Sequence, residues 1–80
     1  MTALEDRYGD ELARIPEGEH GRFLRWTGRG KSPKTVGAAI AYHHARDRRS
    51  QKAVAEDWGV TENGLQQVWR EMFVRQRDDS

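Results

Sequence analysis

The feature that most constrains this chain is the stretch 50–73, SQKAVAEDWGVTENGLQQVWREMF, which predicts two helices joined by a tight turn. Ser50 suits the N-cap of the first helix and Thr61 that of the second, because a side-chain hydroxyl can accept a hydrogen bond from a free backbone N–H of the first turn. Gly59 lies between them, and glycine tolerates the left-handed backbone that closes a helix. The second helix carries one wide apolar stripe, formed by Leu65, Val68, Trp69, Met72 and Phe73.

The spacing inside this stretch is that of a helix-turn-helix. Ala55 is small enough for a close helix crossing, Gly59 makes the turn, and Leu65 and Val68 seat the second helix on the first. The other face of the second helix is polar and carries Glu62, Asn63, Gln66, Gln67 and Arg70. Amide and guanidinium groups form bidentate hydrogen bonds with base edges in the major groove. The stretch predicts a DNA recognition helix, with an ordinary helical hairpin as the alternative, because a fold motif does not establish a function.

Two helices are predicted near the N-terminus. The first begins near Ala3 and ends at Pro16. Its apolar face is formed by Leu4, Tyr8, Leu12 and Ile15. The second is short, spans residues 23–26 and is closed by Gly28. The outer face of the first helix is acidic, so we expect it to point away from any nucleic acid.

A third helix precedes the helix-turn-helix. Ser32 as N-cap, followed by proline at the first helical position, begins the run 33–49. Its glycine and alanines make it slim, so we expect it at the centre of the fold. The predicted fold class is all-α: a small bundle of about five helices that ends in the helix-turn-helix. We expect a single domain over 1–75, with the helix-turn-helix at 50–73 and a disordered tail at 76–80.

The size and composition of the chain exclude several classes of protein. Eighty residues form one small domain. The sequence has no cysteine, so no disulfide can form. It shows no signal peptide and no long apolar run, so we expect no membrane span and an intracellular, cytoplasmic location. No nucleophile–base pair, phosphate loop or metal-ligand set stands out, so we expect neither an enzyme nor a cofactor.

Charge is unevenly distributed along the chain. The net charge is −4 over residues 1–19, +8 over 20–52 and −3 over 53–80. One interpretation of the central block is a surface that faces nucleic-acid phosphates. The alternative is that its basic side chains pair with the acidic ends across the fold. We expect the phosphate contacts to come from Lys31, Lys34, Arg48, Arg49 and Lys52.

Aromatic and histidine residues in the central block have two interpretations each. Trp26 is a stacking platform for a nucleic acid or, as we favour, a core anchor together with Phe23, because so small a core needs its large side chains. His43 and His44 are neighbours and point about 100° apart on a helix, which disfavours a shared metal ion. We therefore interpret both histidines as partly buried polar residues.

Several separate motifs follow one another in the order found in a known family. They are Ser32-Pro33, Ala38 to Tyr42, Ser50-Gln51, Val54-Ala55-Glu56, Gly59-Val60-Thr61-Glu62 and Trp69-Arg70-Glu71. The run from Gly30 to Met72, about half the chain, therefore resembles the end of a cyclin-like repeat of archaeal transcription factor B, a family related to the eukaryotic general initiation factor. The resemblance implies that the last two helices contact promoter DNA beside the TATA box.

The resemblance carries over to individual positions with some departures. It implies DNA contacts by Ser50, Gln51, Thr61, Asn63, Gln66 and Gln67. Gln66 and Val68 stand where the family often has arginine, and Gly64 stands where a helix former is usual, at a cost of about 1 kcal/mol. Residues 1–29 do not match, and a second repeat and a zinc ribbon are absent. We interpret the chain as a single cut-down repeat, not a complete initiation factor.

The predicted function is a small DNA-binding protein that regulates transcription. Its partners would be double-stranded DNA and RNA polymerase or initiation-complex proteins. The predicted DNA-binding residues are Lys31, Lys34, Arg48, Arg49, Ser50, Gln51, Lys52, Thr61, Asn63, Gln66, Gln67 and Arg70. The alternative is a protein-interaction module of the transcription machinery without direct DNA contact, for which an exposed Trp58 or Trp69 would be a structural sign.

Overall fold

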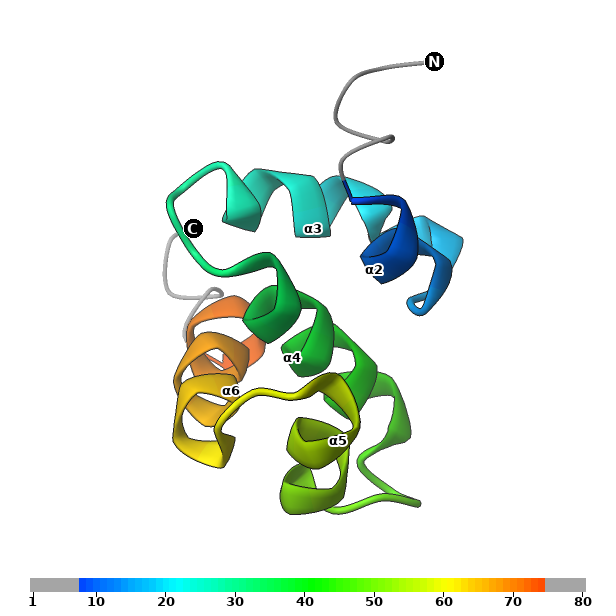
Figure 1. Cartoon of the computed structure of the whole chain (residues 1–80), viewed down its shortest axis with the longest axis vertical. Helices are drawn as coiled ribbons and strands as arrows, with labels where there is room; N and C mark the ends of the chain where they lie inside the picture. The colour runs from blue at the N-terminus through cyan, green and yellow to red at the C-terminus, as the bar shows by residue number, and fades with distance from the viewer. Residues whose placement is uncertain (1–7, 75–80) are drawn as a thin grey trace.

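The computed structural model describes residues 8–74, which form five α-helices and contain no β-strand (Figure 1). The helices are α2 (Gly9–Ala13), α3 (His20–Thr27), α4 (Pro33–Ala45), α5 (Gln51–Trp58) and α6 (Glu62–Trp69), with a short 3-10 turn at Glu17–Glu19 and a π-helical turn at Arg70–Val74. The all-α prediction is confirmed. The predicted helix start near Ala3 and the tail 76–80 lie outside the described residues. Within residues 8–74, no helix combines the length and the apolar character that crossing a membrane requires.

Helix α4 lies at the centre of the fold. It packs against α2, α3, α5 and α6, and Figure 1 shows it in the middle with α3 on one side and α5 on the other. Its residues Val36, Gly37, Ala38, Ala39 and Ile40 are all buried. Small side chains let the neighbouring helices approach closely, so the slim central helix predicted from the sequence is confirmed.

One position of α4 shows how close this approach is. A Cβ atom built on Gly37 would lie 2.5 Å from Cζ3 of Trp58, a separation that no real Cβ atom sustains. The indole of Trp58 therefore rests directly on the backbone of α4. Glycine is required here for space, since its backbone φ is not positive.

The hydrophobic core is shared by all five helices. Phe23 is fully buried and Trp26 is 7% exposed, so both are core anchors as favoured from the sequence. Tyr8 meets Phe23 edge-on, with ring centroids 5.5 Å apart. The helix-turn-helix contributes Val54, Ala55, Trp58, Leu65, Val68 and Met72 to the same core. This shared burial fixes α5 and α6 relative to the rest of the described chain.

The start of α4 agrees with the prediction and its end does not. Ser32 stands at the predicted N-cap with an extended backbone, although its hydroxyl makes no capping hydrogen bond. Proline at the next position, with its fixed φ, still begins the helix. The helix ends at Ala45, before the predicted Arg49, and the carbonyl of Ala45 accepts from the backbone N–H groups of Arg48 and Arg49 at 2.8 Å each.

Candidate nucleic-acid interface

Both helices of the helix-turn-helix begin with a side-chain cap. The hydroxyl of Ser50 accepts a hydrogen bond from the backbone N–H of Ala53 at 3.1 Å. The hydroxyl of Thr61 accepts one from the N–H of Gly64, also at 3.1 Å. Each cap satisfies one of the backbone donors that a helix start leaves free, which stabilises the start by about 0.5–2 kcal/mol. The two caps predicted from the sequence are confirmed.

The turn between α5 and α6 is a Schellman motif. Gly59 adopts the left-handed conformation with φ of +72°. Its N–H donates to the carbonyl of Glu56 at 3.2 Å, and the N–H of Val60 donates to the carbonyl of Ala55 at 3.0 Å. This pair of bonds satisfies the last carbonyls of α5 and turns the chain sharply. The role assigned to Gly59 from the sequence is confirmed.

One further hydrogen bond and one glycine support the start of α6. The side-chain amide of Gln51 donates to the backbone carbonyl of Glu62 at 3.0 Å and so ties the start of α5 to the start of α6. At Gly64, a Cβ atom would lie 2.9 Å from the hydroxyl oxygen of Thr61. Glycine at this position therefore leaves room for the Thr61 cap.

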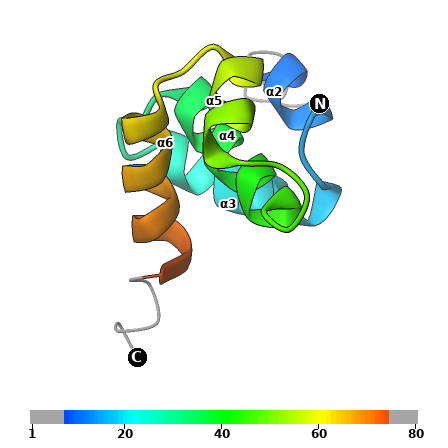
Figure 2. The same cartoon turned by 90° about the horizontal axis from the view of Figure 1, so that it is seen from below.

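Helix α6 has one buried side and one open side. Leu65 and Val68 are buried against the core, as is Met72 in the π-helical turn that follows. The opposite side is exposed, and we name it the recognition face, formed by Glu62, Asn63, Gln66, Gln67 and Arg70. Figure 2 shows α6 at the edge of the molecule. Arg70 is exposed and forms no ion pair with any residue between 8 and 74.

Aromatic contacts hold the end of α6 against α4. Trp69 meets Tyr42 edge-on at 5.5 Å, and its indole N–H donates to Nδ1 of His43 at 3.2 Å. Phe73 stacks on the His43 ring with centroids 3.7 Å apart and planes 5° from parallel. Arg22 covers the Phe73 ring at 4.5 Å. These contacts place the recognition face without using any of its own side chains.

A chain of polar contacts continues from His43 toward the N-terminal half. Nε2 of His44 lies 2.6 Å from a carboxylate oxygen of Glu19, whose other oxygen accepts from Arg22 at 2.9 Å. Burial raises the pKa of Glu19, but the hydrogen bond with His44 and the charge of Arg22 outweigh it, so the pKa lies below its usual value of 4.5. Burial, followed by the charges of Arg46 and His44, lowers the pKa of His43.

The basic residues predicted to contact phosphates do not form one patch. Lys31 pairs with Glu71 at 3.3 Å and Arg49 with Asp57 at 3.8 Å, so the alternative of pairing across the fold holds for these two cations. Lys52 is exposed at the start of α5 and forms no ion pair within residues 8–74.

Arg49 and the recognition face lie on different sides of α5. Gln51 reaches α6, whereas Asp57 lies six positions later, about 120° around the helix axis, and faces Arg49. The structure therefore brings Ser50, Gln51 and Thr61 together with the start of α6, and it takes Arg48 and Arg49 elsewhere.

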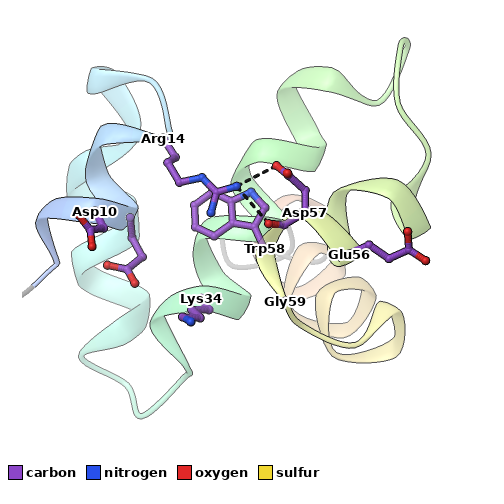
Figure 3. A pocket seen from close by; sticks show the side chains of 8 residues that line it. Asp10, Arg14, Lys34, Glu56, Asp57, Trp58 and Gly59 are labelled. Atoms are coloured by element: carbon purple, nitrogen blue, oxygen red, sulfur yellow. Dashed lines mark hydrogen bonds and ion pairs between the residues drawn. The ribbon is translucent and has the colours of Figure 1, made fainter.

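Lys34 and the Arg14–Asp57 ion pair line a pocket of about 360 Å³ among α2, α4 and α5 (Figure 3). Arg14 donates to the Asp57 carboxylate at 2.8 Å, and its guanidinium lies 4.0 Å from the centre of a Trp58 ring. Asp10, Glu11 and Glu56 also line this pocket, so its rim is mainly acidic.

Sequence reasoning assigned no role to Arg14, which lies 43 positions from Asp57. No local pattern around Arg14 signals this contact. Trp58 is 5% exposed under this guanidinium and Trp69 is partly buried, so neither is the exposed tryptophan that was named as a sign of a protein-interaction module. Within residues 8–74, no three histidine or acidic side chains converge to hold a metal ion.

Comparisons of the chain with protein-family models, with curated proteins and with solved structures found no match.

Proposed function

We propose that this protein binds duplex DNA, with α6 in the major groove and the recognition face directed at the base edges. The observation that carries the proposal is the open polar side of α6, fixed at both ends by contacts that leave Asn63, Gln66, Gln67 and Arg70 exposed. A helix fits the major groove, and amides there pair with adenine while arginine pairs with guanine. Glu62, at the start of the face, suits the exocyclic amine of cytosine.

Phosphate contacts in this proposal come from the start of α5. Lys52 supplies a charge that no described residue neutralises, and the Ser50 hydroxyl retains its own proton as a donor while it caps α5. Arg48 and Arg49 are left out of this surface because Arg49 faces Asp57 on the other side of α5. With few phosphate contacts, the expected fall of affinity with salt is present but shallow.

A pair of charge-reversal variants tests the proposal. Fluorescence anisotropy of a labelled mixed-sequence duplex at low salt should show binding by the unaltered protein at micromolar concentrations. Arg70→Glu should weaken this binding by about 1–3 kcal/mol or more, because it replaces a base contact with a repulsive charge. Arg48→Glu is the control, because it makes the same change in net charge at a side chain that is 72% exposed. It should leave DNA binding nearly unchanged. Equal losses from both variants, or no binding at all, contradict the proposal.

A second experiment separates base reading from charge. Selection from a pool of random duplexes should yield a preferred sequence, and the resemblance to archaeal transcription factor B points to promoter DNA as its natural source. Asn63→Ala and Gln66→Ala should each reduce the preference for the selected duplex over a scrambled one by about 1–3 kcal/mol. Non-specific binding should change little, since neither side chain is charged.

A further inference from the structure

A second pocket lies on the side of α5 away from α6. Its volume is about 270 Å³, and it is formed by the segment after α2, the end of α4, the turn before α5 and the second half of α5. It shares Arg14, Asp57 and Trp58 with the acidic pocket of Figure 3, so the Arg14–Asp57 ion pair stands between the two. The predicted DNA contacts Arg48 and Arg49 both line it.

The rim of this second pocket is cationic. Arg14, Arg48 and Arg49 bring three guanidinium groups from two separate segments, against one lining carboxylate, Asp57. Asp57 is already paired with Arg14 at 2.8 Å and lies 3.8 Å from Arg49. Asp47, which does not line the pocket, lies 3.9 Å from Arg48, so the three guanidinium groups stand against two nearby carboxylates. The rim therefore retains a positive surplus.

The floor of the pocket is apolar. Its accessible part comes from Pro16, Ala41 and Ala45, whereas Val54 and Trp58 lie buried beneath them, 1% and 5% exposed. An apolar floor inside a ring of guanidinium groups suits a ligand that carries a negative charge on an apolar body. At about 270 Å³ the pocket lies just below the usual size of a small-molecule site, so it suits one or two side chains of a larger partner.

The geometry points to a docking site for an acidic protein segment, with aliphatic side chains on the floor and carboxylates on the arginine rim. Guanidinium groups bind carboxylates through paired, charge-assisted hydrogen bonds, and clusters of arginine recur where proteins recognise acidic motifs. The occupant is a segment of another protein in which acidic and aliphatic residues alternate or cluster. This inference does not depend on DNA binding by α6.

Duplex DNA fits this pocket less well than an acidic peptide does. A phosphate backbone carries no apolar group to cover the floor at Pro16, Ala41 and Ala45, and the Asp57 carboxylate faces the rim. The pocket and the recognition face also lie on different sides of α5, since Gln51 reaches α6 while Asp57 faces Arg49. The two surfaces are therefore separate, with DNA on α6 and the protein partner on a different side of α5.

Two-dimensional NMR with an isotope-labelled protein tests the inference. The probe is a short peptide built of Glu-Glu-Leu repeats, and a peptide of Lys-Lys-Leu repeats serves as its charge control. The acidic peptide should shift the indole resonance of Trp58 and the backbone resonances of Ala45, Arg48 and Val54, whereas the basic peptide should not. Shifts confined to other parts of the chain, or no shifts at millimolar peptide, overturn the inference.

The same two charge-reversal variants separate this site from the DNA site. Arg48→Glu should lower the affinity for the acidic peptide by roughly tenfold, because a positive charge on the rim becomes a repulsive negative one. Arg70→Glu should leave the affinity for this peptide unchanged. For duplex DNA the expectation is reversed: Arg70→Glu should weaken binding, and Arg48→Glu should leave it nearly unchanged. If duplex DNA shifts the Trp58 and Arg48 resonances and the acidic peptide does not, the pocket is a phosphate site and the inference fails, whatever the outcome for α6.

Discussion

The indole N–H of Trp69 donates a hydrogen bond to Nδ1 of His43 at 3.2 Å, and this bond joins the last helix of the motif to the central helix. A guanidinium nitrogen of Arg46 lies 3.1 Å from the same ring nitrogen. Because both partners are donors, Nδ1 must be unprotonated, so the neutral ring carries its proton on Nε2. The folded protein therefore requires a neutral His43 at the contact that positions α6.

This requirement predicts a pH dependence of stability. The pKa of His43 is lowered below its usual 6.5 by burial first and then by the charges of Arg46 and His44. The unfolded chain binds more protons than the folded one in the range below pH 6.5, so stability rises with pH there. We expect the contribution of His43 to be complete above about pH 6.5 and to be lost as the pH falls toward the lowered pKa. Urea unfolding followed by circular dichroism between about pH 5 and pH 8 measures it.

The variant His43→Gln provides the comparison for this prediction. Its amide oxygen can still accept from Trp69, but it does not titrate. The variant should therefore show a smaller increase in unfolding free energy from pH 5 to pH 8 than the unaltered protein does. Glu19, whose lowered pKa withdraws stability only as the pH falls below about 4.5, stays outside this range. Identical pH profiles for the two proteins would show that His43 is not the group responsible.

Gly37 predicts a steric effect at the centre of the fold. Gly37→Ala places a Cβ atom 2.5 Å from the Trp58 ring, so the indole or the helix must move. Overpacking of this kind costs about 1–3 kcal/mol, more than the gain in helix propensity from alanine. Gly21→Ala in α3 is the control, because its Cβ atom meets nothing within 4 Å, and it should be neutral or slightly stabilising. Equal midpoints in thermal unfolding would disprove the close contact.

The helix caps predict a difference between two serines at equivalent positions. Ser50 accepts a capping hydrogen bond from Ala53, whereas Ser32 makes no capping bond at the start of α4. Ser50→Ala should cost about 0.5–2 kcal/mol and Ser32→Ala clearly less. Thr61→Ala should resemble Ser50→Ala, since Thr61 caps α6 in the same way. Chemical denaturation of the three variants measures the difference, and an equal loss for both serines would refute it.

We expect the Arg14 side chain to make a modest, salt-dependent contribution to the free energy of unfolding. Its guanidinium stacks on Trp58 and pairs with Asp57, with 43% of the side chain exposed. Arg14→Ala should cost about 1 kcal/mol at low salt and less at high salt, because an exposed pair is screened. Arg48→Ala, on a side chain that is 72% exposed and stacks on no ring, should change stability by less than about 0.5 kcal/mol. A loss from Arg14→Ala that salt does not reduce would mean that packing, not charge, holds the contact.

Local sequence was sufficient to predict the two helices of the helix-turn-helix and the turn between them. Ser50, Gly59 and Thr61 act within four residues of themselves, through backbone groups whose positions a helix start or end already dictates. The apolar periodicity of Leu65, Val68 and Met72 likewise predicts which side of α6 is buried. The caps, the turn and the buried side of α6 depend only on the spacing of nearby residues, and they were predicted correctly. The N-cap position of Ser32 was also predicted correctly, but only the structure shows that its hydroxyl makes no capping hydrogen bond.

Tertiary structure alone decided which long side chains meet. The contact of Arg14 with Asp57 spans 43 positions and that of Trp69 with His43 spans 26, and no periodic pattern links such pairs. Arg49 belongs to a basic block by sequence, yet in the turn before α5 it lies beside Asp57, on a side of α5 that does not face α6. The physical reason is that flexible charged side chains reach whichever partner helix packing brings near, and that packing is a property of the whole core. The sequence therefore determined the presence of an outward polar helix, and the fold determined that its neighbouring cations lie on two separate surfaces.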